Sequence, residues 1–260
     1  MEIIIKPTVA EAQMETANIF RRQIKHKPDS VLGLATGSTP IGVYALLVRM
    51  RERGELDFSQ VSTFNLDEYV GLEASHPCSY REFMREHLFG KVNLAPARIH
   101  FPDGMAKDVP LHCAEYEAQM TRAGGIDLQL LGIGREGHIG FNEPSSSLAS
   151  RTRIKTLTPQ TVQDNARFFG SADKVPRHVI TMGVGTIMET RHCLMLATGE
   201  AKADAVARMA EGPITADLPA SILQMHPVCT LVVDEAAAAD LKRCEYYRWV
   251  YDNKPDWQRV

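Results

Sequence analysis

The sequence predicts an α/β protein: one domain built on a mostly parallel, twisted sheet with helices on both faces. Short apolar runs alternate with longer amphipathic stretches along the 260 residues, and neither an internal repeat nor a low-complexity linker interrupts them. Strand–helix alternation of this kind gives a parallel sheet whose right-handed crossovers place helices on both faces. The length suffices for one large domain, so we assign residues 1–260 to a single domain.

Six apolar runs predict the strands. Runs of this length, bounded by polar or glycine-containing segments, are typical of buried strands. In chain order they are VLGLAT (31–36), VSTFNL (61–66), IDLQLLGIG (126–134), HVITMGV (178–184), CLMLATG (193–199) and CTLVVD (229–234).

Four amphipathic stretches predict helices. They are IGVYALLVRMRERG (41–54), SYREFMREHLF (79–89), KADAVARMAEG (202–212) and DEAAAADLKRCEYYRWVY (234–251). Ser79 is a suitable N-cap for the second of them. In such folds ligands bind beyond the carboxyl ends of the strands, near a switch in strand order. Polar segments that directly follow predicted strands are therefore the first candidates for a site.

The composition excludes several classes of protein. A net charge of −3 and a pI near 6.3 give no electrostatic footprint for nucleic acid or an anionic membrane. The five cysteines are scattered without CxxC spacing, which indicates reduced thiols in a cytoplasmic protein and argues against a zinc site. The start MEIIIKPTVAEAQ lacks the features of a signal peptide, and no apolar run is long enough to span a bilayer.

The segment TGSTP (36–40) joins the first predicted strand to a helix. Gly37 permits close backbone approach, Ser38 and Thr39 offer hydroxyl and N–H groups, and Pro40 suits a first helical turn. A helix N-terminus behind a glycine binds phosphate through its N–H groups and its dipole. The alternative interpretation is an ordinary strand-to-helix turn.

The segment FNLDEYVGL (64–72) ends the second predicted strand with Asp67 and Glu68. Adjacent side chains of an extended chain point in opposite directions, so we expect one carboxylate to face the ligand cleft and the other to face away. A solvated acidic loop is the alternative, and the position at a strand's carboxyl end favours function.

The segment GIGREGHIGFNEP (132–144) carries Glu136, His138 and Glu143 among four glycines. A histidine can move protons near neutral pH, and a carboxylate on one ring nitrogen fixes its tautomer and orientation. Both glutamates are candidates for that partner. We disfavour a metal site, because no second histidine lies nearby at helical spacing.

Basic residues form the last group of candidates. Arg151, Arg153 and Lys155 alternate and would share one face of an extended chain, while Arg167 lies in DNARFFG. Lys202 follows a strand and Gly199 and opens a helix, which is again a position where phosphates are held.

At this point the chain resembles the glucosamine-6-phosphate deaminases, members of the glucosamine/galactosamine-6-phosphate isomerase family. The resemblance rests on FNLDEYVGL, GHIGFNEP, SSLASRTRIKTLT, ARFFG and LQMHP, and it runs from about residue 3 to about residue 245. It implies a Rossmann-like fold and the conversion of glucosamine 6-phosphate and water to fructose 6-phosphate and ammonia. No cofactor is implied, because proton transfer and hydrolysis require neither electrons nor a group carrier. The run RTRIKTLT distinguishes this group from the related 6-phosphogluconolactonases.

The resemblance also implies roles for individual residues. Asp67 corresponds to the base that moves a proton between sugar carbons 2 and 1, His138 to the histidine that opens the ring, and Glu143 to its orienting partner. Glu136 stands where several members carry aspartate, and we expect this longer side chain still to reach the imidazole. The phosphate site corresponds to Gly37, Ser38, Thr39, Arg167 and Lys202.

Some family members are hexamers that N-acetylglucosamine 6-phosphate activates at a subunit boundary. Ser146, Arg153 and Lys155 correspond to the positions that bind this effector. The family's C-terminal tyrosine falls near Tyr247 or Arg248, and the tail DNKPDWQRV (252–260) departs from the pattern. The alternatives on the same fold are a galactosamine-6-phosphate deaminase, a 6-phosphogluconolactonase and a non-catalytic sugar-phosphate sensor. The presence of Asp67, His138 and Glu143 disfavours the sensor.

Overall fold

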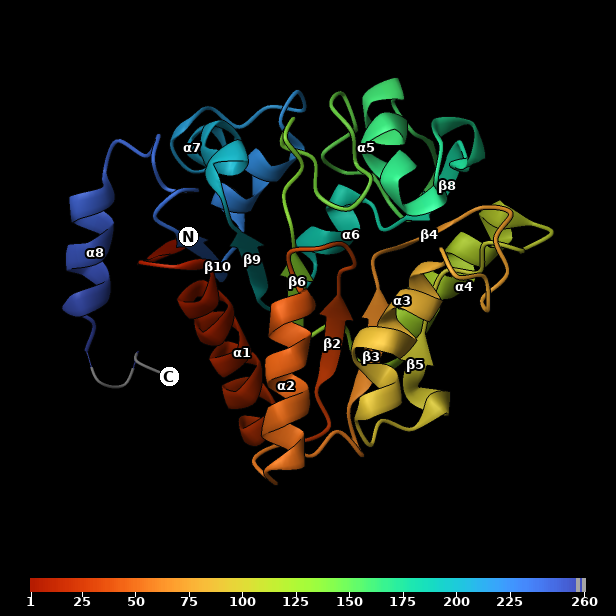
Figure 1. The fold of residues 1–260 in the computed structure, drawn as a ribbon, viewed down its shortest axis with the longest axis horizontal. Coiled ribbons are helices and arrows are strands. Elements are labelled where there is room, and N and C mark those ends of the chain that lie inside the picture. Colours follow the sequence, from red (N-terminus) through yellow and green to blue (C-terminus); the bar gives the residue numbers. More distant parts are fainter. Residues whose placement is uncertain (256–257, 259–260) are drawn as a thin grey trace.

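A computed structural model describes residues 1–255 and 258, so part of the divergent tail lies outside the described residues (Figure 1). The main sheet has seven strands, all paired in parallel, in the order β1-β10-β9-β6-β2-β3-β5. The prediction of a mostly parallel sheet is confirmed. The strands are β1 (Glu2–Lys6), β2 (Val31–Leu34), β3 (Ser62–Asn65), β5 (Ile99–His100), β6 (Leu128–Leu131), β9 (Cys193–Ala197) and β10 (Cys229–Asp234).

Helices cover both faces of this sheet. In Figure 1, α1 (Val9–His26) and α2 (Ile41–Glu52) lie side by side in front of the strands, and α6 (Val184–Met188) lies behind them. Helices α3 (Tyr80–His87) and α4 (Val109–Arg122) flank the β3–β5 side. Ser79 caps α3 as predicted, because its Oγ accepts the N–H of Glu82.

A second, three-stranded sheet stands beyond β3. It consists of β4 (Asp67–Tyr69), β8 (His178–Thr181) and β7 (Arg153–Thr156), paired antiparallel in that order. The prediction that 178–184 would join the parallel sheet is wrong. The chain bends at Leu66, whose N–H donates to Leu34 of β2 and whose carbonyl accepts from Met182. Strand β4 thereby leaves the main sheet, and β8 pairs with it above a small apolar cluster that includes Tyr69, Phe141 and Val179.

The prediction of one helix over 234–251 is also wrong, because α8 spans only Cys244–Asp252. The Asp234 carboxylate accepts N–H groups from Gly199 and Ala237, which turns the chain directly after β10. The Ala237 bond is of the kind that an N-cap makes, but the turn does not continue as a helix, because the Glu211 carboxylate accepts the N–H groups of Lys242 and Arg243. The alanines that suggested a helix are in part buried in this turn, as Ala237 and Ala238 show.

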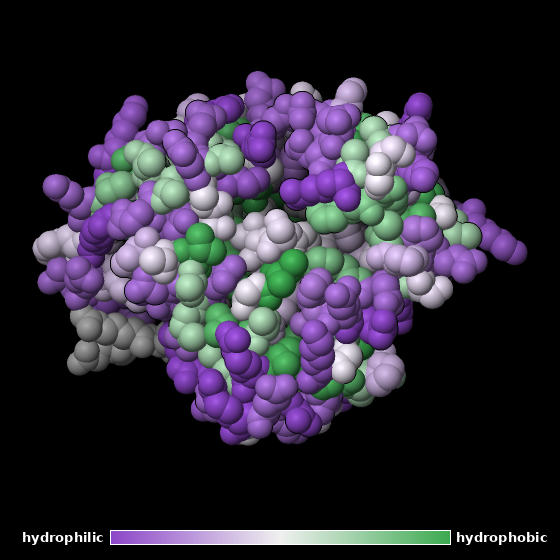
Figure 2. All heavy atoms as spheres, in the orientation of Figure 1, coloured by the Kyte–Doolittle hydropathy of each residue, from purple (hydrophilic) through white to green (hydrophobic). Residues whose placement is uncertain are grey.

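The carboxyl ends of the parallel strands all point toward one side of the molecule. In Figure 1 this is the upper side, where α5 (Pro159–Phe169) and α7 (Ala203–Glu211) lie above the strands. Figure 2 shows the surface hollowed between these two helices. Within the described residues, no helix has the length and apolar character needed to cross a bilayer.

Candidate active site

The loop 132–144 follows β6 and lies at the carboxyl edge of the sheet. It begins with a tight turn in which the N–H of Gly137 donates to Gly134 O and the N–H of Gly134 donates to His138 O. Arg135 and Glu136 are exposed at the tip of this turn, and His138 is half-buried behind it. The turn therefore returns the chain so that the imidazole lies back against Gly134.

Gly134 is required by this close approach. A Cβ atom at position 134 would lie 2.2 Å from Cε1 and Nε2 of His138, far inside van der Waals contact. Only a residue without a side chain lets the ring pack flat on the backbone here. Gly134, one of the four glycines of this segment, thus makes room for the imidazole of His138.

The carboxylate next to His138 is that of Glu143. His138 Nδ1 lies 3.1 Å from Glu143 Oε2, and Thr161 Oγ1 donates to Glu143 Oε1 at 2.5 Å. Burial alone would raise the pKa of Glu143, but contacts with His138 and Thr161 outweigh burial and hold it below its ordinary value. An ionised carboxylate at Nδ1 leaves Nε2 of the ring for a ligand. The role of Glu136 stays a prediction, and the structure places it on the exposed turn instead of beside Nδ1.

Thr161 was absent from the residues predicted from the sequence. It lies in the first turn of α5, whose N-cap Thr158 accepts the Thr161 N–H. Helix α5 therefore presents the hydroxyl that holds Glu143. A threonine in the first turn of a helix is ordinary, so its position in the sequence carried no distinct signal of a second role.

Asp67 lies beneath the same loop. It is the first residue of β4 and is 6% exposed. Two hydrogen bonds hold the loop 132–144 in place above Asp67. The Phe141 N–H donates to Thr181 Oγ1, and the Asn142 side-chain amide donates to Met182 O, at the end of β8. A Cβ on Gly140 would lie 3.5 Å from Asp67 Oδ2, so the loop backbone passes directly over this carboxyl group.

Burial raises the pKa of Asp67 to about 8, and the neighbouring charge of Glu68 adds to the shift. A carboxyl group with such a pKa can accept a proton far more readily near neutral pH than an exposed aspartate can. Among ionisable groups, this combination of burial and position in a ligand cleft favours a functional role.

The TGSTP segment lies between β2 and α2 as predicted. Gly37 adopts a left-handed backbone with φ of 99°, Ser38 is exposed, and Thr39 is half-buried with its carbonyl facing Gln13. Helix α2 begins at Ile41, one residue later than a proline in the first turn would imply, with Pro40 as its N-cap. These residues lie at a strand's carboxyl end and a helix N-terminus, where anions are favoured.

Three cations gather on the other side of the cleft. Lys202, directly before α7, donates from Nζ to Ile133 O at 2.7 Å and so lies against the loop 132–144. Burial lowers the pKa of Lys202, and the positive charges of Arg135 and Arg167 lower it further, opposed by Asp164. The structure therefore brings the predicted Lys202 and Arg167 together and adds Arg135, which the sequence analysis overlooked. Its place inside the conspicuous loop could have identified it.

Arg153 and Lys155 lie on β7, whereas Ser146 lies directly after the loop 132–144, where its N–H donates to Glu143 O. Arg153 donates to Asn142 Oδ1 at 2.8 Å, and burial lowers its pKa. The hydroxyl of Ser146 is buried and has no hydrogen-bond partner within the described part of the chain. Arg151 precedes β7 and does not share a face with Arg153 and Lys155 as the alternation predicted. Its guanidinium instead pairs with Glu117 and Glu189.

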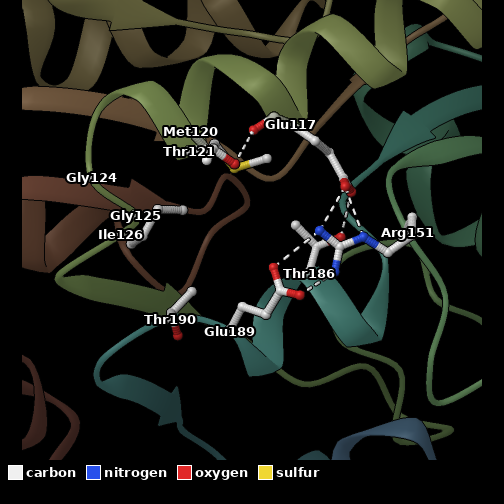
Figure 3. Close-up of a pocket in the computed structure, with 10 residues that line it drawn as sticks. All are labelled: Glu117, Met120, Thr121, Gly124, Gly125, Ile126, Arg151, Thr186, Glu189 and Thr190. Atoms are coloured by element: carbon white, nitrogen blue, oxygen red, sulfur yellow. Dashed lines mark hydrogen bonds and ion pairs between the residues drawn. The ribbon is translucent and has the colours of Figure 1, made fainter.

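Arg151 instead lines a separate cavity of about 290 Å³ at the amino end of β6 (Figure 3). There Glu117 accepts hydrogen bonds from Arg151, Thr186 and the Thr152 N–H. The polar groups of this cavity thus satisfy one another, and the cavity lies at the opposite end of β6 from His138. Over residues 1–255 and 258, no three His, Cys, Asp or Glu side chains gather in a metal-binding cluster.

Comparison with known proteins identifies what this arrangement resembles. The family model of glucosamine-6-phosphate isomerases and 6-phosphogluconolactonases matches residues 6–232. A glucosamine-6-phosphate deaminase of Arthrobacter sp. (strain FB24) is 55% identical over 99% of both chains, and one of Mycolicibacterium smegmatis is 52% identical over the whole of both.

Two solved structures extend the comparison. A monomeric glucosamine-6-phosphate deaminase is 44% identical with a TM-score of 0.90, and it covers 92% of this chain and 100% of its own. A 6-phosphogluconolactonase from Trypanosoma brucei covers 92% of this chain and 98% of its own, with a TM-score of 0.73 and 20% identity. The lactonase likeness concerns the fold alone.

Proposed function

The chain belongs to the family of glucosamine-6-phosphate isomerases and 6-phosphogluconolactonases, and we propose that it is a glucosamine-6-phosphate deaminase. The reaction converts glucosamine 6-phosphate and water to fructose 6-phosphate and ammonia. The observation that carries the proposal is the buried carboxyl of Asp67 directly under the loop of His138 and Glu143. An isomerase needs such a base at carbon 2, whereas hydrolysis of a lactone does not.

The phosphate of the sugar binds first in this scheme. In this proposal the turn Gly37–Thr39 supplies N–H and hydroxyl donors, and the cations Arg135, Arg167 and Lys202, which influence one another electrostatically, supply the positive charge. A phosphate dianion relieves the mutual repulsion of these cations, and charge-assisted hydrogen bonds fix its position. Anchoring one end of the substrate places carbons 1 and 2 near Asp67 and holds them in a reactive geometry.

Ring opening is the task of His138. Glu143 holds Nδ1, so Nε2 moves a proton between the anomeric hydroxyl and the ring oxygen, and the C1–O5 bond breaks. The product is the open-chain aldehyde with the amino group still on carbon 2. Glu136 lies close by on the turn and is proposed to assist this step.

Isomerisation and deamination follow. Ionised Asp67 takes the proton from carbon 2, which gives an enolamine, and returns it to carbon 1, which gives a 2-imine. Water adds to carbon 2, the C–N bond breaks, and ammonia leaves with fructose 6-phosphate as the product. No electron is transferred and no group is carried between substrates, so the proposed reaction requires no cofactor.

The test is to measure ammonia and fructose 6-phosphate released from glucosamine 6-phosphate. We expect equal amounts of both products. Galactosamine 6-phosphate and 6-phosphogluconolactone serve as competing substrates, and faster turnover of either would replace the proposal by that alternative. Binding of the phosphosugar without any turnover would support a sensor instead.

An effector site is proposed beside β7 for N-acetylglucosamine 6-phosphate. The buried, unpartnered hydroxyl of Ser146 and the half-buried guanidinium of Arg153 support it, with Lys155 on the same face of the strand. Arg153 also bonds Asn142, next to Glu143, so occupation of this site would act directly on the active-site loop. A substrate curve that the effector leaves unchanged would refute this assignment.

Assembly and location complete the proposal. The family resemblance implies a homohexamer that acts on phosphosugars in the cytoplasm, whereas the 44% identical structure is that of a monomer. Light scattering on the eluted protein distinguishes a 28.9 kDa monomer from a particle six times heavier. We expect the larger particle, because an effector site at a subunit boundary requires it.

A further inference from the structure

Glu68 occupies an unusual position for a carboxylate. It directly follows Asp67 in β4 and is 3% exposed. Its carboxylate accepts three backbone N–H groups, from Tyr69 at 2.9 Å and from Tyr80 and Arg81 at 3.0 Å each. Tyr80 and Arg81 are the first two residues of α3, so Glu68 joins β4 to the N-terminus of that helix. The N–H groups and the helix dipole both stabilise an anion here.

Asp67 has no comparable support of its own. Within the described residues no hydrogen bond holds its carboxyl group, so its orientation depends on its backbone. That backbone is fixed by antiparallel pairing with Thr181 on one side and by the attachment of Glu68 on the other. Because adjacent side chains of a strand point in opposite directions, anchoring Glu68 toward α3 directs Asp67 toward the cleft.

The titratable groups that interact electrostatically with Asp67 come from four elements. They are the phenols of Tyr44 on α2, Tyr69 on β4, Tyr80 on α3 and Tyr116 on α4, and the carboxylate of Glu68. Burial raises the pKa of each of these phenols, and the charge of Asp67 raises it further, so they stay neutral. Burial also raises the pKa of Glu68, while its three N–H donors and Arg81 oppose that shift and favour its charge.

We propose that Glu68 is a positioning residue for the isomerisation step. Through its bonds to α3, Glu68 orients the Asp67 carboxylate, and its own carboxylate places a second negative charge next to Asp67. The inference rests on the proposed function, in which Asp67 is the base at carbon 2. It assigns Glu68 two separable effects, one of geometry and one of charge. Two substitutions of the same residue, together with a control at the helix cap, can therefore tell them apart.

Glu68→Gln removes the charge and keeps the length of the side chain, but its amide nitrogen replaces one acceptor oxygen, so at least one of the three N–H bonds is lost as well. Wild-type kcat/KM should rise with pH as Asp67 ionises near pH 8 in the free enzyme. This rise is the acid limb of the pH profile. Without the charge of Glu68, the pKa of Asp67 should fall, and the acid limb should move to lower pH. Glu68→Asp keeps the charge and shortens the side chain by one methylene, so the limb should stay while kcat falls by roughly tenfold or more, as expected for a misplaced base.

Ser79→Ala is the matched control. It removes the other cap of α3, the acceptor for the Glu82 N–H, without changing the charge beside Asp67. It should lower the thermal unfolding temperature and leave the acid limb in place. An acid limb that moves equally in Ser79→Ala and Glu68→Gln would show that loosening α3 is the whole effect and would overturn the inference.

The wild type measured in the same assay separates this inference from the proposed function. A wild type that does not deaminate glucosamine 6-phosphate sinks the proposed function. If the wild type is active and Glu68→Gln leaves the acid limb of its pH profile unchanged, the role of the Glu68 charge is refuted. Circular dichroism at each pH checks folding, and if Glu68→Gln does not fold, Glu68→Asp decides: wild-type kcat in that variant would overturn the positioning role.

Discussion

Replacing Asp67 by asparagine should make the protein less active and more stable at alkaline pH. The amide has nearly the shape of the carboxyl group and cannot act as a base. Loss of a positioned general base typically costs about 10²–10⁴-fold in rate, so turnover should fall by that factor while phosphosugar binding is retained. The gain in stability follows from the same burial that makes Asp67 reactive.

The sign and size of that gain follow from the pKa. Folding raises the pKa of Asp67 from its ordinary value near 4 to about 8. Between these values the native state holds a proton that the unfolded state has lost, so wild-type stability falls as the pH rises. Each pH unit corresponds to about 1.4 kcal/mol, which gives a total of the order of 5 kcal/mol for this 6% exposed group. Asparagine does not titrate and escapes this loss.

Urea unfolding of both proteins at pH 5.5 and pH 9 measures the effect. The difference in unfolding free energy, variant minus wild type, should grow by roughly 3 kcal/mol between the two pH values. The exposed Asp240→Asn variant controls for the loss of a surface charge and should show a constant difference. A difference for Asp67→Asn that is equal at both pH values would refute the burial argument, and undiminished turnover would refute the role as base.

Four further substitutions test the remaining parts of the site. His138→Gln should impair the closed-ring substrate far more than an open-chain analogue, and equal losses in a steady-state assay would contradict a ring-opening role. Gly134→Ala should displace the imidazole and lower kcat on the order of 10²-fold, which stopped-flow or endpoint assays detect. Arg135→Gln should raise KM about tenfold with kcat retained, because it removes binding common to ground and transition states. Thr161→Val should lower kcat roughly tenfold or more by unseating Glu143, and Thr161→Ser should restore most of it.

The fold was predictable where local pattern and tertiary structure agree. The apolar runs at 31–36, 193–199 and 229–234 became central strands, because each is buried on both faces of a parallel sheet. The run at 178–184 has the same composition, yet its partners are decided by the bend at Leu66, a long-range feature that periodicity does not encode. The helix over 234–251 failed because Glu211 accepts the N–H groups of Lys242 and Arg243, a long-range contact that the helix propensity of four alanines does not reveal.

The site was predictable for residues that stand at strand ends. Asp67 and His138 follow strands of the parallel sheet, so topology predicted that both would lie at its carboxyl edge. Arg135 and Thr161 were missed, because a lone arginine on a turn and a threonine in the first turn of a helix have ordinary explanations in sequence. Their roles depend on the approach of Lys202 and Glu143 from segments far away in the chain.

Helix α5 connects the two halves of the site. Its first turn holds Glu143 through Thr161, and its last turn carries Arg167, whose charge acts on Lys202. The orientation of the proposed ring-opening pair, His138 and Glu143, and the strength of the proposed phosphate site therefore depend on the same eleven-residue element. In the proposed function a phosphate bound by Arg167 would also stabilise the helix position in which Thr161 holds Glu143. A phosphosugar thus favours the catalytic arrangement more strongly than a sugar without phosphate, which gives the anchor a part in the chemistry as well as in binding.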